Sequence, residues 1–283
     1  MNPVKIFTDS TADIPIELRK QYNISFVPLY VLIGGDSYRD QVDINTAKLY
    51  DLVEEYKELP KTAAPSTQDL GNAFRPWIDD GYDIIFFGIS SNLSATVQSA
   101  NLAAQEFDEG RVRIVDSRNL CAGIGLMAMK AAQWASQGMG SKEIFDKIED
   151  MKPRVRTSFI IDTLKYLHMG GRCSSIEAIA GTVLKIRPQI LVEDGSLVVV
   201  DKHRGKKEKV LNIFYNNFLA GKPNIDGNIV VAHSADISSA EILKSKAIQE
   251  YNSEDILTVE AGTVISSHCG PGTVGIMYIE KDA

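Results

Sequence analysis

The chain has 283 residues, of which 44% are hydrophobic and 24% are charged, and its formal net charge is -7. This length is sufficient for one large or two medium domains with hydrophobic cores. The acidic excess argues against nucleic acid as a partner, because binding to a phosphate backbone requires clusters of basic residues. We expect a cytoplasmic protein, because the first residues are strand-like, no stretch is long enough for a membrane span, and the three cysteines lie far apart.

The first half of the chain alternates predicted strands and helices. Strands are expected at 4–8, 24–33, 84–89 and 112–115, and helices from about 15, 46, 68, 97, 120 and 141. Such alternation indicates βαβ units and therefore an α/β fold with a mainly parallel sheet and flanking helices. We expect residues 59–66 to form an extended loop, since they contain two prolines, and residues 38–40 to form an exposed loop.

The pattern changes near Pro153. A strand is predicted at 156–161, and two apolar runs at 190–193 and 197–201 flank Asp194-Gly195, which is a strong hairpin signal. The second half is therefore expected to contain a mixed or antiparallel sheet with helices. We predict two domains, at 1–153 and 154–283.

The junction after the strand at 84–89 is the most informative part of the chain. Its apolar residues lead into Ser90, Ser91, Asn92 and Ser94, and a helix follows. In open α/β sheets, ligands bind at the carboxyl ends of strands and the amino ends of helices, where free N–H groups favour an anion. Thr62, on the loop that contains the two prolines, and Ser94 are the leading candidates to donate to one carboxylate or phosphate. Capping of the helix alone is the other interpretation of Ser94.

The same junction partly matches the nucleophile motif of serine hydrolases. Gly88-Ile89-Ser90-Ser91-Asn92 has the spacing of G-x-S-x-G. However, Asn92 stands at the position of the last glycine, and that glycine is the residue that permits the sharp turn of the motif. A serine hydrolase that acts on acyl esters at Ser90–Ser94 is therefore kept as an alternative.

Other polar residues provide weaker signals. His268 precedes Gly270-Pro271-Gly272, and we expect it on a loop that approaches a ligand closely. Arg172 follows two glycines, and basic residues gather around Arg204 and Lys206. The histidines lack the spacing of a metal site, and no glycine-rich stretch matches a nucleotide-binding loop.

Several separated segments together resemble one family. They are, in order, 7–15, 27–29, Lys61-Thr62-Ala63-Ala64-Pro65-Ser66, Ile89–Thr96, Val115-Asp116-Ser117, Gly171-Arg172, 184–188 and the region around His268. The chain resembles the DegV family of bacterial fatty-acid-binding proteins, which includes the binding subunit of fatty acid kinase. The likeness covers nearly the whole chain.

The resemblance implies a carrier rather than an enzyme. Its ligand would be a long-chain, palmitate-like fatty acid whose carboxylate is held by Thr62 and Ser94, with His268 near the carboxylate. Ser91 and Asn92 are candidates for further head-group contacts because they are hydrogen-bond donors beside Ser94, although they also suit a turn. The resemblance implies no cofactor or metal. A separate fatty acid kinase catalytic subunit would phosphorylate the carboxylate to an acyl phosphate, and it would dock at Arg172, Arg204 and Lys206. Transient contact with a membrane surface would serve lipid exchange.

The sequence departs from the family pattern at the Ala63-Ala64 pair and at Asn92 and Ala95. These changes keep the hydroxyls of Thr62 and Ser94, so carboxylate binding is still expected, but they leave chain-length preference open. A lipid sensor without a kinase partner is a further alternative.

Overall fold

The structure is a computed structural model that describes residues 2–173, 186–222, 224–251 and 255–282. Leu184 and Lys185 of the motif at 184–188 lie outside the described residues. Among the residues described, none of the helices is long and apolar enough to cross a bilayer.

The first sheet is parallel, as predicted, with the strand order β2-β1-β6-β7. Its strands are β1 (Val4–Asp9), β2 (Ser25–Val27), β6 (Asp83–Gly88) and β7 (Val112–Asp116), and the helices around it are α1 (Ile16–Gln21), α3 (Thr67–Asp79), α4 (Thr96–Ala104), α5 (Ala122–Ser136) and α6 (Ser141–Met151). Apolar residues alternate along β6, so that Ile84 and Phe86 pack with α3 and α4 while Ile85 and Phe87 pack with α5. Burial on both faces explains why β6 reads as a continuous apolar run.

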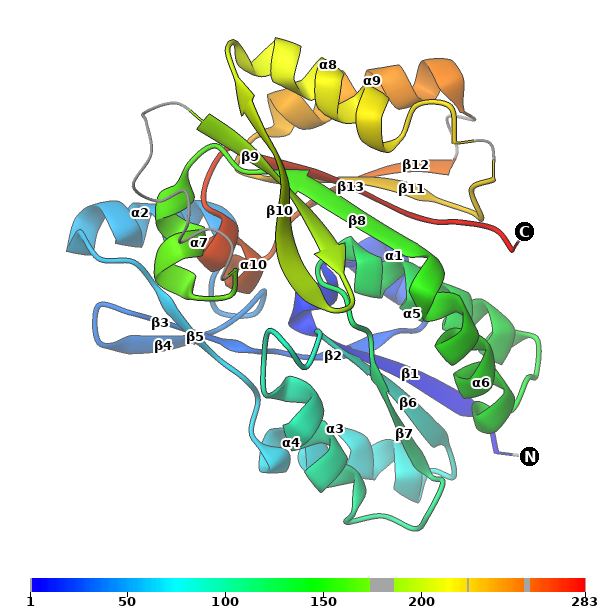
Figure 1. Ribbon diagram of the computed structural model, residues 1–283. Helices are drawn as coiled ribbons and strands as arrows, with labels where there is room; N and C mark the ends of the chain where they lie inside the picture. Colours follow the sequence, from blue (N-terminus) through cyan, green and yellow to red (C-terminus); the bar gives the residue numbers. More distant parts are fainter. Residues whose placement is uncertain (1, 174–185, 223, 252–254, 283) are drawn as a thin grey trace.

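The second sheet is mixed, with the order β10-β9-β8-β13-β11-β12. Its strands are β8 (Val155–Ile160), β9 (Ile186–Glu193), β10 (Ser196–Arg204), β11 (Ile229–Ser234), β12 (Ile256–Glu260) and β13 (Thr273–Ile279). Helices α8 (Lys207–Phe218) and α9 (Ile237–Glu250) cover one face, and α5 packs on the other face and also on β1 (Figure 1). Helix α5 therefore lies between the two sheets. The predicted fold class is confirmed, and the domain limits stay a prediction.

A third, small sheet has the order β4-β3-β5 and corrects two expectations. It consists of β3 (Tyr30–Ile33), β4 (Asp36–Arg39) and β5 (Lys61–Ala63), and α2 (Thr46–Tyr56) packs on β3. The expected exposed loop at 38–40 is wrong, because residues 38 and 39 belong to β4 and Asp40 is fully buried. The predicted extended loop at 59–66 contains β5, which places Thr62 opposite Val31.

Two short helices connect the small sheet with the six-stranded sheet. Helix α10 (Thr263–Cys269) contacts α2, β3 and β5, and it also packs on α7 (Leu164–Gly170). Because α10 follows β12 directly in the chain, it holds the small sheet against the six-stranded sheet, which contains β12. Two turns of 3-10 helix are also present, one after β1 at Ser10–Ala12 and one before β8 at Lys152–Arg154.

The hairpin between β9 and β10 reaches across to the parallel sheet. Asp194 and Gly195 both have positive φ angles, as the Asp-Gly signal predicts for the turn. The Ser90 hydroxyl donates to the Gly195 carbonyl at 2.7 Å, and the Asn92 amide donates to the Asp194 carbonyl at 3.2 Å and to Ser196 Oγ at 3.0 Å. A Cβ on Gly195 would lie 2.5 Å from Ser90 Oγ.

We predict that Gly195→Ala destabilises the protein by about 1–3 kcal/mol more than Gly138→Ala does. Both glycines have positive φ, 80° and 84°, but a Cβ at Gly138 meets nothing within 4 Å. The two substitutions therefore share the backbone cost, and only Gly195→Ala displaces Ser90. Urea unfolding of both variants measures the difference, and equal costs would show that the hairpin contact contributes nothing.

Candidate ligand-binding site

Two adjoining cavities lie where the three sheets meet. The first, which we call the head cavity, has a volume of about 270 Å³, and the second, the inner cavity, about 60 Å³. Leu120, Leu197, Ile265 and His268 line both of them. The two cavities therefore adjoin at these four side chains, and His268 lies at the boundary between them.

Thr62 and His268 meet at the head cavity. Strand β5 presents Thr62, and its Oγ1 lies 2.8 Å from His268 Nε2. The sequence predicts His268 on a loop, and this is wrong, because His268 lies in the last turn of α10. The following residues, Gly270-Pro271-Gly272, do connect α10 to β13 as the glycines indicate.

The His268 imidazole is neutral. Burial lowers its pKa to about 4, and the positive charge of Arg172 lowers it further in the same direction. The Nδ1 atom has no hydrogen-bond partner among the described residues. An unpaired buried N–H is rarer than an unpaired acceptor, so we assign the proton to Nε2. Nε2 then donates to Thr62 Oγ1, which leaves the threonine hydroxyl hydrogen free to donate to a ligand.

Ser94 also lines the head cavity, at the start of α4. The cap position is Ala95, whose side chain makes no capping bond, and Ser94 Oγ accepts from the Thr96 N–H at 3.3 Å. Ser94 Oγ also lies 2.9 Å from Thr96 Oγ1. If Thr96 donates in this pair, the Ser94 hydroxyl hydrogen is available to a ligand. A capping role and a ligand-binding role are therefore compatible at Ser94.

Arg172 supplies the cation of the head cavity. It follows Gly171, which ends α7 in the left-handed conformation. Its guanidinium donates to the Gly170 carbonyl at 2.6 Å and to the Leu93 carbonyl at 3.3 Å. These two bonds connect α7 to the segment that carries Ser94.

The structure does not bring the other predicted site residues into this cavity. The Ser91 hydroxyl donates to Asp116 at 2.6 Å, and the Asn92 amide binds the hairpin turn. Arg204 is exposed at the end of β10, and Lys206 lies at the cap position of α8. Kinase docking at these two positions stays a prediction.

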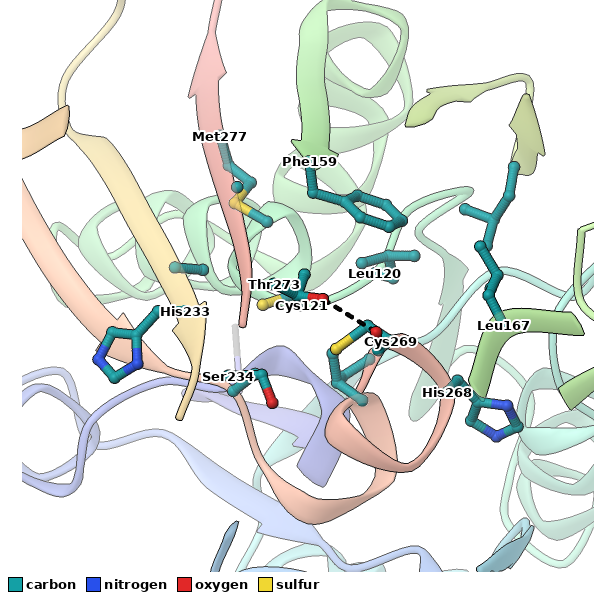
Figure 2. Close-up of a pocket in the computed structure, with 15 residues that line it drawn as sticks. Leu120, Cys121, Phe159, Leu167, His233, Ser234, His268, Cys269, Thr273 and Met277 are labelled. Carbon is teal, nitrogen blue, oxygen red and sulfur yellow. Dashed lines mark hydrogen bonds between the residues drawn. The ribbon is translucent and has the colours of Figure 1, made fainter. Parts of the chain in front are cut away.

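The inner cavity is apolar, and sequence reasoning missed most of its wall. In Figure 2 the side chains of Phe159, Leu167, Leu120 and Met277 surround it, together with those of two cysteines and Ser234. The Thr273 hydroxyl donates to the Cys269 carbonyl at 2.9 Å, so it is satisfied within the protein. Burial raises the pKa of the Cys269 thiol to about 12 and that of the Cys121 thiol well above its usual value, so both cysteines are neutral thiols. Such a wall suits a hydrocarbon chain.

The geometry gives little support to the hydrolase alternative. No serine in the described part of the chain hydrogen-bonds to a histidine side chain. The hydroxyl of Ser90, the serine of the partial motif, donates to the Gly195 carbonyl. Across residues 2–173, 186–222, 224–251 and 255–282, no cluster of three or more histidine, cysteine or acidic side chains could hold a metal ion.

The comparison with known proteins decides the family. A family model described as an uncharacterised protein of the DegV family matches residues 3–281. The chain belongs to the DegV family. A DegV domain-containing protein from Caldanaerobacter subterraneus is 32% identical to it over 99% of this chain and 100% of that protein.

Solved structures of DegV family proteins share the whole architecture. One describes fatty acid binding of a DegV family protein from Thermus thermophilus, and it matches with a TM-score of 0.90 at 31% identity over 99% of this chain and 100% of that one. Another is DegV, a fatty acid binding protein from Bacillus subtilis, with a TM-score of 0.85 at 28% identity over 99% of this chain and 100% of that one.

We predict that His268 makes the free energy of unfolding fall as the pH is lowered from about 6.5 towards 4. The folded state lowers the pKa of this imidazole, so its contribution is complete above the unfolded value and is lost as the pH falls through the folded value. The loss should reach about 3 kcal/mol at most. Burial raises the pKa of Asp9 to about 6, which acts in the opposite direction, so the difference between wild type and His268→Gln isolates the histidine. Parallel pH profiles for the two proteins would contradict the assignment.

Proposed function

We propose that this protein binds one long-chain fatty acid, with its carboxylate in the head cavity and its tail in the inner cavity. The observation that carries this proposal is that a cavity with polar groups of Thr62, Ser94 and His268 in its wall adjoins an apolar cavity. The family supports it, because relatives at 31% and 28% identity are described as fatty acid binding.

The tail would supply most of the affinity. Burial of a methylene group contributes about 0.8 kcal/mol, so roughly 15 methylenes contribute on the order of 12 kcal/mol before the costs of ordering and association. The inner cavity of about 60 Å³ is small for such a tail. Its wall must therefore adjust on binding, and Met277 is the most adaptable side chain there.

The head group would be positioned by neutral donors. Thr62 can direct its hydroxyl hydrogen at a carboxylate oxygen when His268 Nε2 donates to its oxygen. Ser94 can do the same when Thr96 donates to its oxygen. Neutral donors avoid the cost of burying a cation beside the carboxylate. His268 would act through Thr62, since its Nε2 is occupied by the threonine.

The protein would present the bound carboxylate to a separate kinase subunit rather than catalyse a reaction itself. Arg172 lines the head cavity and is exposed, so a partner that approaches the bound carboxylate can contact it. Arg204 and Lys206 would extend the docking surface. For lipid exchange, Met169 on α7 is 69% exposed beside Gly170 and could contact a membrane surface transiently.

We predict that Thr62→Val and Ser94→Ala each weaken fatty acid binding by roughly tenfold, because each removes one hydrogen bond to a charged group. The double variant should be weaker still, and acyl phosphate formation with the cognate kinase should fall with it. Isothermal titration with palmitate measures the affinity. Ser91→Ala is the matched control, because its hydroxyl binds Asp116 outside the cavity. Wild-type binding and phosphorylation in the double variant would refute the head-group assignment.

We predict that Arg172→Ala retains the lipid but lowers kinase-dependent phosphorylation by at least about tenfold. The substitution removes a guanidinium from the docking surface, and a guanidinium can make two hydrogen bonds to one carboxylate or phosphate group. Arg75→Ala is the control, since its guanidinium pairs with Glu106 on the face of the parallel sheet that α3 and α4 cover. Phosphorylation at the wild-type rate would favour a lipid sensor without a kinase partner. Loss of lipid from a folded variant would assign Arg172 to the ligand instead.

A further inference from the structure

The inner cavity extends along two neighbouring strands of the six-stranded sheet. Thr273, Gly275 and Met277 follow one another on one face of β13, and all three line the cavity. On β11, Ser234 pairs with Thr273 and Ala232 pairs with Gly275, and both also line the cavity. This face of the sheet packs on α5. The cavity therefore runs from the α10 end of β13 to Met277, which is about 13 Å along a strand.

The middle of this path has almost no side chains on its floor. Gly275 has no side chain and Ala232 has only a methyl group. Their outer neighbours in the sheet are larger, because Phe159 pairs with Gly275 and Val259 pairs with Ala232. Gly275 and Ala232 thus form a groove between two larger side chains, which we call the small-residue groove.

Met277 reaches back into the small-residue groove. A Cβ on Gly275 would lie 3.3 Å from Met277 Cε and 3.0 Å from Phe159 Cβ. Because Met277 lies two residues beyond Gly275 on the same face, its side chain must extend along β13 towards the head cavity. Figure 2 shows it directed into the cavity, towards Thr273. A hydrocarbon tail can therefore pass over Gly275 only if the methyl end of Met277 turns away.

The other side chains around the groove can give way less easily. Gly275 and Ala232 have nothing to move, and the Phe159 ring is almost fully buried and flanks the groove rather than crossing it. Methionine is unbranched and has three rotatable bonds, so it can change its shape at low cost. Met277 is also the lining residue of β13 that lies furthest from α10.

We propose that Met277 determines the length of the fatty acid tail that this protein prefers. This inference rests on the proposed function. The tail lies in the small-residue groove, displaces the methyl end of Met277 from Gly275 and ends against the displaced side chain. A longer tail finds no further space along β13, and a shorter one leaves part of the groove without contacts.

Two substitutions should change the preferred length in opposite directions. Met277→Ala removes Cγ, Sδ and Cε, which frees space for about two methylene groups. Each methylene group that is removed from water strengthens binding about fourfold, so two should favour a longer acid by roughly tenfold. Gly275→Ala adds a Cβ in the path of the tail, 3.3 Å from Met277 Cε, and should favour a shorter acid by about fourfold.

The experiment is a competition between saturated fatty acids, read by native mass spectrometry. The protein is mixed with an excess of laurate, myristate, palmitate, stearate and arachidate in equal amounts, and the mass of the folded complex identifies the bound acid. Met151→Ala is the matched control, because Met151 is equally buried in the same core but lines neither cavity. We expect the bound acids to shift towards longer chains in Met277→Ala and towards shorter chains in Gly275→Ala, and to keep the wild-type proportions in Met151→Ala.

A second measurement uses the wild-type protein and does not depend on the folding of a truncated variant. The ¹³C-methyl resonance of Met277 is assigned with Met277→Leu, a substitution that keeps the side-chain volume. Palmitate should shift this resonance strongly, because the methyl group leaves Gly275, and should leave that of Met151 in place.

Wild-type proportions of bound acids in a folded Met277→Ala protein would overturn the proposal. Palmitate that binds without moving the Met277 resonance would overturn it as well. In both cases fatty acid binding itself would stand. Uptake of no acid of any length by the wild-type protein is a different result, and it would overturn the proposed function together with this inference.

Discussion

The hydrogen bond between Thr62 and His268 is the contact on which the site depends. It joins residues that are 206 positions apart, one on the small sheet and one on the helix that follows β12. Without it the Thr62 hydroxyl would lack the donor that orients it. The neutral state of His268 follows from burial. A charged imidazole at this position would instead require a fixed counter-ion, which would compete with a ligand carboxylate.

The two cavities divide the work of binding between two kinds of interaction. The apolar wall between α5, β8 and β13 can supply affinity without specificity, since burial of hydrocarbon is not directional. The hydroxyls at the head cavity can supply position with little affinity. Both cavities meet at α10, which is held at its start by buried acids and carries His268 near its end. Such a division suits a protein that must hold a lipid in one orientation while its carboxylate stays within reach of a partner.

Local patterns in the sequence predict the elements well, and contacts across the chain explain the failures. The parallel sheet could be predicted because its buried strands are runs of apolar residues. The Asp194-Gly195 hairpin could be predicted because these two residue types favour a tight turn. Asp40 reads as an exposed loop residue, yet it is buried because Thr263 binds it, and nothing near it in the sequence indicates this. Asn92 reads as a head-group contact because it is near Ser94, but its side chain points to the hairpin instead. Phe159 and Met277 line the inner cavity, and their sequence pattern does not differ from that of a packed core.

The most direct test of the account is the identity of what the purified protein carries. Native mass spectrometry gives the mass of the intact protein with its ligand, and mass spectrometry of an organic extract under denaturing conditions identifies that ligand. We predict one long-chain fatty acid per chain. A protein that carries no lipid and also takes up none when fatty acid is added would contradict it, and the hydroxyls of Thr62 and Ser94 would then have to serve a different anion.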